Sequence, residues 1–285
     1  MTYRLSDSDI DRLIDEDIPY GDLTTALLGI SERAGEIVFT TRESTTLCCT
    51  EEAARILEKC GASVKILLPS GTEVKSGATI LSATGSAGSL HAGWKAALNM
   101  LEYASGIATR TNRIVSRATA FNPAIRVVTT RKSFPGTKKI ALKAIMAGGA
   151  VPHRLGLSDS ILLFRQHALF LGGHEKVAEA ILSLKAKAPE HKIVAEAECE
   201  EEAMLLAAAG AEIIQLDKLD PAPLGQLVLR LHAGFPDLKI SAAGGINGEN
   251  AAEYAATGVD MLVLSSPYFG KPADIGVAIL PVMQQ

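Results

Sequence analysis

Short apolar runs alternate with amphipathic stretches through the second half of the chain. The predicted strands after Pro123 are Ile125–Val128, Val151, Ile161–Phe164, Ile193–Ala197, Glu212–Leu216, Lys239–Ala242 and Met261–Leu264. The later runs recur at nearly even spacing with a helical pattern between them, which is typical of a parallel sheet built from βα-repeats. The number of strand starts predicts a closed or nearly closed βα barrel.

The first third of the chain has a different rhythm. Its predicted strands lie close together, at Ile37–Thr41, Thr45–Thr50, Val64–Leu68, Thr72–Val74 and Thr79–Thr84. Ser6 followed by Asp9 predicts a capped helix, and Glu51–Cys60 predicts another. Because strands with few helices between them do not alternate as a barrel does, residues 1 to about 90 predict a small α+β layer. The next segment, His91–Phe121, predicts two helices broken near Ser105-Gly106.

Composition and charge narrow the class of protein. With 47% hydrophobic and 21% charged residues, the chain has an ordinary globular make-up. A net charge of −4 and a pI near 5.9 give no support for nucleic-acid binding. The cysteines form no CxxC pair, the N-terminus lacks an apolar signal segment, and no apolar run reaches membrane-spanning length. These features predict a cytoplasmic protein that binds neither nucleic acid nor membrane.

Cationic and protonatable residues follow several of the predicted barrel strands. They are Arg131, Lys132, His153, Arg154, Arg165 and His167. Functional groups of parallel βα folds gather at the carboxyl ends of strands, so these side chains are expected to converge. Fixed cations orient carboxylates and phosphates by charge-assisted hydrogen bonds, which predicts a site for a multiply anionic small molecule. The alternative is a set of solvated surface charges.

Two acids close later strands of the predicted barrel. Glu196 lies near the end of VAEAE, and Asp217 ends IIQLD. Two carboxylates together with substrate phosphates can hold Mg²⁺, and the same pair could stabilise a developing sugar cation. The alternative is that each acid pairs with a neighbouring cation such as Lys218 or Arg165. For Glu196 and Asp217 a role in the site is favoured over a structural ion pair, whereas for Glu198 neither interpretation is favoured.

Glycines and serines follow the last two predicted strands. Gly244-Gly245 precedes a predicted helix at Glu249–Ala256, and Ser265-Ser266 follows Met261–Leu264. Glycines before a helix let backbone N–H groups approach a phosphate, helped by the helix dipole. The same turn also occurs for geometric reasons alone, but a late phosphate loop is a recurrent device of βα barrels.

The chain resembles the type II phosphoribosyltransferases, which are typified by quinolinate phosphoribosyltransferase. The matching blocks, in order, are EDIPYGDLTT (16–25), ALNMLEYASGIAT (97–109), TRKSFPG (130–136), HRLGLSD (153–159), AEAE (195–198), LDK (216–218), GGIN (244–247) and TGVD (257–260). A closer similarity, to the ModD subgroup associated with molybdenum transport, is carried by AVPHRLGLS (150–158), FRQH (164–167) and SSPYFGKPADI (265–275).

The resemblance implies an α/β fold with two domains. An N-terminal α/β sandwich would occupy residues 1–108 together with the C-terminal tail 268–285, and an incomplete TIM-like βα barrel would occupy 109–267. It also implies a homodimer with shared active sites. The implied reaction is Mg²⁺-dependent transfer of a phosphoribosyl group from 5-phosphoribosyl-1-diphosphate (PRPP) to a nitrogen-heterocycle acid, with release of pyrophosphate.

The resemblance also assigns roles to individual residues. Lys132, Glu196 and Asp217 would be catalytic, and the two acids would also face the metal. The implied substrate-binding residues are Lys95, Arg131, His153, Arg154, Phe164, Gly244, Gly245, Ser265 and Ser266. Among them, Gly244-Gly245 would take the 5′-phosphate, and the cations would contact the acid or the donor.

Departures from the quinolinate type concern the acceptor pocket. Quinolinate-type members carry Glu-Arg where this chain has Trp94-Lys95, and Lys where it has Phe164. The other departures are Ala141-Leu142 for Glu-Lys, Pro152 for Asn and Arg165-Gln166 for Asp-Asn. Losing a cation and an arginine fork predicts an acceptor with fewer negative charges than quinolinate.

Three alternatives to this prediction remain open. The chain could be a true quinolinate phosphoribosyltransferase of NAD biosynthesis. It could instead be a catalytically silent phosphoribosyl- or nucleotide-binding protein linked to molybdenum transport. A third reading is a barrel lyase that uses Lys132 as a Schiff-base amine, which borohydride trapping would detect.

Overall fold

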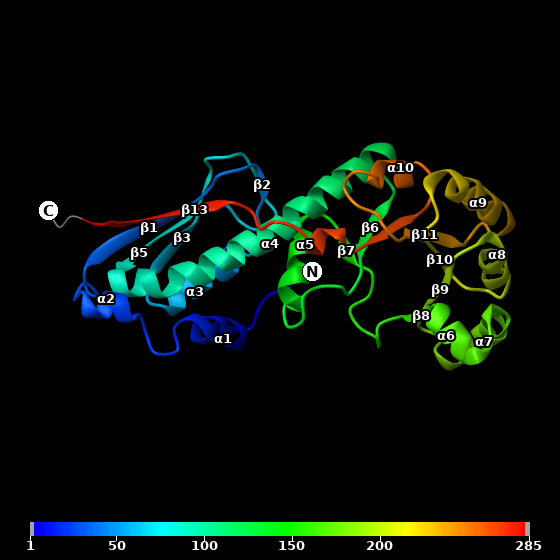
Figure 1. The fold of residues 1–285 in the computed structure, drawn as a ribbon, viewed down its shortest axis with the longest axis horizontal. Coiled ribbons are helices and arrows are strands. Elements are labelled where there is room, and N and C mark those ends of the chain that lie inside the picture. The colour runs from blue at the N-terminus through cyan, green and yellow to red at the C-terminus, as the bar shows by residue number, and fades with distance from the viewer. Residues whose placement is uncertain (1–2, 283–285) are drawn as a thin grey trace. The chain divides into compact units, whose positions relative to one another are not determined.

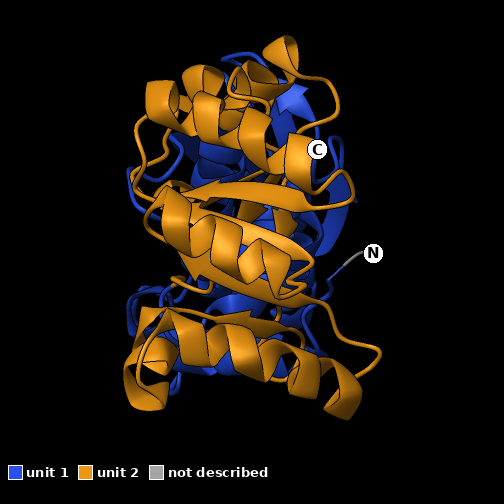
Figure 2. Cartoon of the chain, turned by 90° about the vertical axis from the view of Figure 1, so that its right-hand side faces the viewer, with its two compact units in different colours: residues 1–112, 134–149, 268–285 blue, residues 113–133, 150–267 orange. Residues whose placement is uncertain are grey.

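Two large sheets, one parallel and one antiparallel, organise the chain, and a third sheet has only two strands (Figure 1). The computed structural model describes residues 3–282. The chain divides into a first unit of Met1–Asn112, Phe134–Gly149 and Tyr268–Gln285, and a second of Arg113–Ser133 and Ala150–Pro267 (Figure 2). The mixed α/β fold, with a distinct antiparallel layer and an incomplete barrel, is therefore as predicted.

The second unit is built on a parallel sheet in the order β7-β6-β12-β11-β10-β9-β8. Its strands are β6 (Arg126–Thr129), β7 (Val151–Pro152), β8 (Ile161–Leu163), β9 (Ile193–Ala197), β10 (Ile213–Asp217), β11 (Lys239–Ala243) and β12 (Met261–Leu264). Every predicted barrel strand is confirmed. Although β7 and β8 follow one another in the chain, they occupy opposite ends of the sheet, and no helix lies in the connection 153–160. The barrel is therefore open at this seam.

Helices cover the sheet of the second unit, as Figure 2 shows in orange. They are α6 (Arg165–Leu171), α7 (His174–Lys187), α8 (Glu200–Ala208), α9 (Pro221–Gly234) and α10 (Ala251–Ala255). Strands covered on both faces must be apolar along most of their length, and β11 is buried at every position after Lys239. This is why continuous apolar runs could be read as strands.

The first unit contains an antiparallel sheet in the order β13-β1-β5-β3 and a two-stranded sheet, β2-β4. Its strands are β1 (Ala34–Thr41), β2 (Thr45–Thr46), β3 (Ser63–Ile66), β4 (Glu73–Val74), β5 (Thr79–Ser86) and β13 (Ile275–Pro281). Its helices are α1 (Asp7–Asp17), α2 (Leu23–Leu27), α3 (Thr50–Lys59), most of α4 (Ala87–Phe121) and α5 (Lys138–Ala147). Ile37 and Phe39 are fully buried on one face of β1 and form part of the core. The tail reaches this unit because β13 pairs antiparallel with β1.

The unit boundaries differ from the expected 1–108 and 109–267. The first unit extends to Asn112 and also includes residues 134–149, which contain α5. On the inner side of α5, Ala144 and Ile145 are fully buried, and Ala144 belongs to the core that α3 and β1 share. A helix that lies between two barrel strands in sequence therefore packs with the other unit.

The predicted break in the long helix is wrong, because α4 runs unbroken through Ser105-Gly106. Ser105 is fully buried, and its hydroxyl oxygen accepts a hydrogen bond of 3.0 Å from the backbone N–H of Cys48. A Cβ at Gly106 would lie 2.8 Å from the Lys271 carbonyl oxygen. The small pair thus permits close packing within the first unit. Despite the length of α4, no helix within residues 3–282 is both long and apolar enough to cross a membrane.

The predicted strand Thr45–Thr50 is also wrong beyond Thr46. Cys49 adopts a left-handed conformation with φ of 61°, which ends extended structure and precedes α3. Cys48 and Cys49 are both fully buried and form no disulfide, and the Cys48 thiol donates a hydrogen bond of 3.7 Å to the Cys49 sulfur. They act as small core residues of the first unit.

A buried ion cluster joins α5 to α3 in the first unit. The Nζ atom of Lys143 lies 2.7 Å from a Glu51 carboxylate oxygen and 2.5 Å from a Glu52 carboxylate oxygen. Lys143 is 7% exposed and Glu52 is 1% exposed, so neither charge has much access to water. Ion pairing takes the place of the water that these charged side chains would otherwise bind. Removing any one of the three residues would therefore leave a charge without its partner.

Candidate active site

The predicted site residues follow the carboxyl ends of the barrel strands. Arg131 and Lys132 follow β6, and His153 and Arg154 follow β7. The remaining ones are Phe164 after β8, Glu196 in β9, Asp217 at the end of β10, Gly244-Gly245 after β11 and Ser265-Ser266 after β12. All of them belong to the second unit, whereas Lys95 belongs to the first. The parallel sheet therefore brings all but Lys95 to one edge.

Glu196 is held by a neighbour that the sequence analysis overlooked. Gln215 pairs with Glu196 in the strand register and donates a hydrogen bond of 2.9 Å from its Nε2 to the Glu196 carboxylate. Burial, followed by the charge of Asp217, raises the pKa of Glu196. Gln215 is 5% exposed, and its Oε1 has no partner within the described residues. The sequence feature that could have identified Gln215 is its place as a polar residue inside the apolar run IIQLD.

Asp217 forms an ion pair with the next residue. The Nζ atom of Lys218 lies 2.8 Å from the Asp217 carboxylate, and the pKa of Lys218 is raised by this hydrogen bond and by the Asp217 charge. The pairing with Lys218 that the sequence left open therefore exists. The suggested pairing of Arg165 with a site acid involves Glu198 instead, at 3.7 Å. Arg165 begins α6 and does not continue the strand.

Gly244 lets the ends of β10 and β11 approach closely. Its φ is 91°, and a Cβ there would lie 2.8 Å from the Lys218 backbone nitrogen and 3.0 Å from an Asp217 carboxylate oxygen. Gly245 also has a positive φ, 69°, but a Cβ there would meet nothing within 4 Å. The first glycine is thus required by contact and conformation, and the second by conformation alone.

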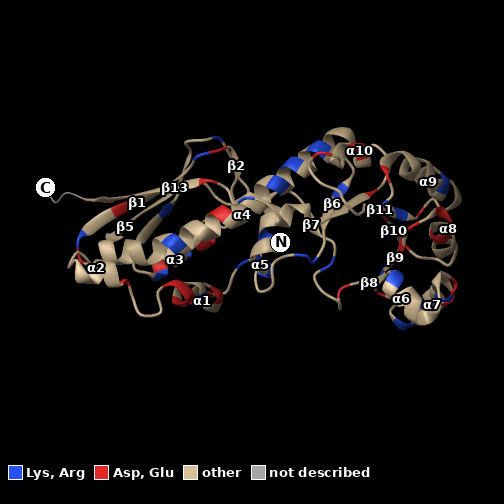
Figure 3. Ribbon diagram, viewed as in Figure 1, with Lys and Arg blue, Asp and Glu red and all other residues tan. Residues whose placement is uncertain are grey.

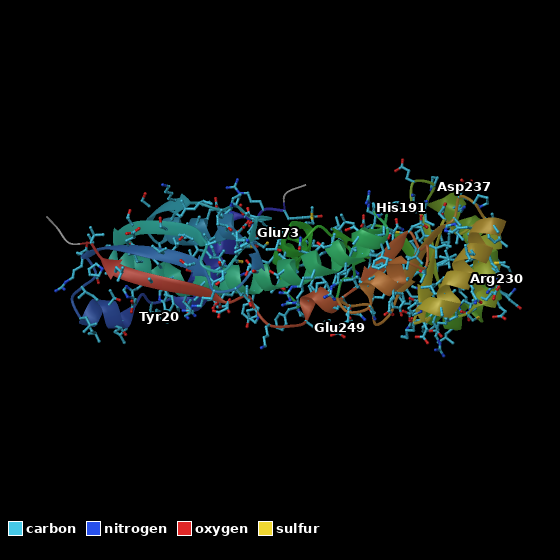
Figure 4. All side chains as sticks on the ribbon, turned by 90° about the horizontal axis from the view of Figure 1, so that it is seen from above. Tyr20, Glu73, His191, Arg230, Asp237 and Glu249 are labelled. Carbon is cyan, nitrogen blue, oxygen red and sulfur yellow. The ribbon has the colours of Figure 1, made fainter. Side chains whose placement is uncertain are left out.

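The helix expected after these glycines is shorter than predicted. It spans Ala251–Ala255, and residues 248–250 form a turn instead. The Asn250 side chain accepts a hydrogen bond of 2.8 Å from the backbone N–H of Asn247, which closes the turn locally. A helix of five residues has a small dipole. The backbone N–H groups of the glycine turn would therefore contribute more to binding a phosphate than the helix would. Glu249, labelled in Figure 4, is exposed within this turn.

The two adjacent glycines allow a matched prediction. Gly244→Ala is expected to lower the free energy of unfolding by about 2 to 4 kcal/mol, because left-handed strain adds to steric contact with Lys218 and with the Asp217 carboxylate. Gly245→Ala should cost only about 1 kcal/mol of strain. Urea unfolding of both variants measures the difference. Equal losses for the two variants would contradict the close-approach argument.

Arg131, Arg154 and His153 lie close together beyond β6 and β7. Burial and then the charge of Arg131 lower the pKa of Arg154, and burial and then the charge of Arg154 lower the pKa of His153. Arg131 and Lys132 are exposed, whereas His153 and Arg154 are half-buried. Figure 3 shows Lys and Arg in blue and Asp and Glu in red around the strand ends of this unit. Neighbouring like charges are stabilised by a bound anion, which fits a phosphate- or carboxylate-binding role.

Phe164 forms an aromatic pair at the start of α6. Its ring centroid lies 4.3 Å from that of His167, in an edge-to-face arrangement with an interplanar angle of 61°. Phe164 and Glu196 line the same small cavity in the second unit. At the position where the resemblance implies a lysine, an apolar ring therefore lines the same small gap as a site acid.

Ser266 links the last barrel strand to the glycine turn. Its hydroxyl donates a hydrogen bond of 2.9 Å to the Ile246 carbonyl oxygen. Ser265 and Ser266 are both half-buried. Ser266 thus holds the loop that Gly244-Gly245 begins, and this is a structural task alongside the substrate-binding role that the sequence predicted.

Lys95 lies on α4 in the first unit, and its Nζ is 4.2 Å from the centroid of the Trp94 ring. Both residues line a pocket of about 440 Å³ whose other walls include His91 and residues of the EDIPYGDLTT motif. Tyr20 of that motif is 99% exposed (Figure 4). Apart from the buried Thr25, the motif therefore forms a surface around Lys95.

The acids of the second unit offer hard oxygen ligands. Residues 3–282 contain no group of three or more His, Cys, Asp or Glu side chains arranged to hold a metal ion. Mg²⁺, however, is usually held by one or two carboxylates with substrate phosphates and water. Glu196 and Asp217 fit this requirement, since they lie on neighbouring strands and their charges interact.

Comparison with known proteins relates this arrangement to one family. The ModD protein of Rhodobacter capsulatus, described as a pyrophosphorylase, is 45% identical over 252 residues, which are 88% of this chain and 96% of that protein. The nicotinate-nucleotide pyrophosphorylase [carboxylating] of Mycobacterium leprae is 31% identical over 265 residues, 90% of each chain. The structure of NadC from Streptococcus pyogenes superposes with a TM-score of 0.89 at 25% identity, covering 98% of this chain and 99% of that one.

Models of both domains of one family match nearly the whole chain. The N-terminal domain of quinolinate phosphoribosyl transferase matches residues 22–105, and the C-terminal domain matches residues 107–277. The two matches agree with the antiparallel layer and the open barrel. The chain therefore belongs to the quinolinate phosphoribosyl transferase family, which makes it an enzyme of the pentosyltransferase class.

Proposed function

We propose that this enzyme transfers the phosphoribosyl group of PRPP to the ring nitrogen of a heterocyclic acid and releases pyrophosphate. The observation that carries the proposal is the edge of the barrel at which Glu196, Asp217 and Gly244-Gly245 meet on neighbouring strands. Carboxylates there would stabilise positive charge as it develops on the ribose. The glycine turn would take the 5′-phosphate through backbone N–H groups.

The cations have complementary tasks in this proposal. Lys132 would neutralise charge on the departing pyrophosphate, while Arg131, His153 and Arg154 would orient donor and acceptor anions. Glu196 and Asp217 would hold Mg²⁺, which as a Lewis acid would offset charge on the diphosphate. The Glu196 orientation would be maintained by the hydrogen bond from Gln215.

The acceptor would carry fewer negative charges than quinolinate. Phe164 offers an apolar ring edge beside Glu196, and Lys95 lacks the bidentate fork of an arginine. A second acceptor carboxylate left without its cation typically costs a few kcal/mol. An aromatic or heterocyclic monoacid is therefore the preferred acceptor class.

We also infer a homodimer with shared active sites in the reducing cytoplasm. The inference rests on family membership and on the exposed motif surface around Lys95. Sedimentation would test the dimer. Mixing two variants, Lys95→Ala and Glu196→Gln, would test sharing, because shared sites would restore part of the lost activity.

Pyrophosphate release provides the central test. Purified protein would receive PRPP and Mg²⁺ with quinolinate, nicotinate or other heterocyclic acids, and Glu196→Gln would serve as the blank. Release with a monoacid but not with quinolinate supports the proposal in full. Release with quinolinate would indicate an NAD-pathway enzyme. If no acid supported pyrophosphate release although the protein still bound PRPP, the result would indicate a binding protein.

Restoring the missing cations should change acceptor choice. Phe164→Lys together with Lys95→Arg is expected to raise kcat/KM with quinolinate by about ten- to hundredfold, since each change supplies charge or geometry for a second carboxylate. The control replaces the first change by Phe170→Lys, because Phe170 lies on α6, the helix that Phe164 precedes as N-cap, and is 96% exposed. No gain over this control would contradict the altered acceptor pocket.

A further inference from the structure

Lys218 adopts a backbone conformation that is rare for its residue type. Its φ is 58°, and among the described non-glycine residues only Cys49 also has a positive φ. The left-handed conformation is unfavourable in free energy for any residue that has a Cβ atom. It persists only where the surrounding structure enforces it. Such outliers often mark functional positions, and Lys218 directly follows Asp217 at the carboxyl end of a barrel strand.

The neighbouring strand end holds this conformation in place. The backbone N–H of Lys218 donates a hydrogen bond of 2.8 Å to the Ala243 carbonyl oxygen. The hydrogen at Gly244 leaves room for the Lys218 side chain, since a Cβ there would lie 2.6 Å from the Lys218 Cγ. The turn is therefore fixed by the same strand pair that presents Asp217 and the glycine loop.

The side chain turns back onto the preceding carboxylate. Its Nζ lies 2.8 Å from the Asp217 carboxylate oxygen, although the Lys218 side chain is 74% exposed. Its charge also interacts with those of Glu196 and Glu198, so one ammonium partly neutralises three carboxylates. A divalent cation cannot occupy the same place on the Asp217 carboxylate as this ammonium. Because the lysine stem is flexible and solvated, the ammonium can leave when a stronger competitor arrives.

We propose that Lys218 is a built-in counter-cation of Asp217, which a divalent metal ion must displace in order to bind. The enzyme would then hold the metal weakly alone and more firmly once donor phosphates supply further oxygen ligands. The inference rests on the proposed function only in assigning the metal to Glu196 and Asp217. Lys218 is accordingly a positioning residue that sets metal affinity.

Direct binding of Mn²⁺ without PRPP tests the proposal. Lys218→Asn removes the ammonium, and asparagine tolerates the left-handed backbone. The variant is expected to bind Mn²⁺ on the order of tenfold more tightly than the wild type, since a fixed positive charge near the ion is gone. Electron paramagnetic resonance of free Mn²⁺ measures this affinity without catalysis. Adding Asp217→Asn to the variant should abolish the gain.

The matched control is Lys239→Gln. Lys239 forms a similar ion pair of 2.9 Å with Asp260, away from the Asp217 carboxylate. Its substitution changes the net charge equally and should leave Mn²⁺ affinity unchanged. If Lys218→Asn bound Mn²⁺ no more tightly than this control, the proposal would be overturned. Lys218→Gly, which removes both charge and backbone strain, provides the same comparison should the asparagine variant fold poorly.

Failure of this proposal can be separated from failure of the proposed function. A gain in Mn²⁺ affinity without pyrophosphate release by the wild type would support the counter-cation and sink the transferase proposal. Pyrophosphate release without any gain in Lys218→Asn would do the reverse.

Discussion

Asp217→Asn is expected to lower kcat/KM for PRPP-dependent pyrophosphate release by about a thousandfold. The substitution keeps the shape of the side chain but removes the charge that would stabilise a cationic ribosyl centre, and losses of about 10²–10³ are typical of such groups. Asp217 sits on the strand next to that of Glu196, whose pKa responds to its charge. Steady-state kinetics with the best acceptor of the panel measures the loss.

Asp220→Asn is the matched control for this experiment. Asp220 lies three residues further along, is exposed, and makes no side-chain capping hydrogen bond at the start of α9. Its substitution should leave kcat/KM within about twofold and stability within about 0.5 kcal/mol. If Asp217→Asn lost less than tenfold in kcat/KM while its Tm equalled that of the wild type, this residue would have no place in the proposed mechanism.

Lys143→Met is expected to lower the free energy of unfolding by about 3 to 5 kcal/mol. Methionine preserves much of the lysine volume, so the loss reflects the Glu52 carboxylate left buried without a partner. Glu52 is 1% exposed and depends on the Lys143 ammonium at 2.5 Å. Urea unfolding monitored by circular dichroism measures the change.

Two comparisons separate charge from packing in this cluster. Adding Glu52→Gln to Lys143→Met should recover much of the lost stability, because the stranded charge is removed. Lys139 lies on the same helix as Lys143 and pairs with Asp9 of α1, so Lys139→Met should cost less than about 1 kcal/mol. A cost below about 1 kcal/mol for Lys143→Met itself would contradict the buried-ion interpretation.

The cluster also predicts how stability responds to acid. Although burial alone would raise it, hydrogen bonds from Lys143 and Ser70 lower the pKa of Glu51 to about 2, against an ordinary value of 4.5. A lowered acid pKa stabilises the fold above the unfolded-state value, and that stabilisation is lost as pH falls from 4.5 toward 2. In Lys143→Met, this part of the acid dependence should shrink.

Local patterns predicted the barrel strands and the residues that follow their carboxyl ends. The strand ends that carry Arg131, His153 and Asp217 were identifiable because buried parallel strands are apolar and end where polar residues begin. The same reasoning misjudged Ser105-Gly106, since a small pair permits either a break or close packing. It also overlooked Gln215, whose hydrogen bond to Glu196 depends on strand register.

The sequence by itself determined the α/β class, the barrel strands and the family, because these depend on periodicity and on motifs within short windows. The tertiary structure decided the features that join distant residues. It placed α5 with the first unit, clamped Lys143 between Glu51 and Glu52, and turned Lys218 back onto Asp217 against Gly244. No local pattern specifies such partners, since burial and steric contact between separate segments arise only when the chain is folded.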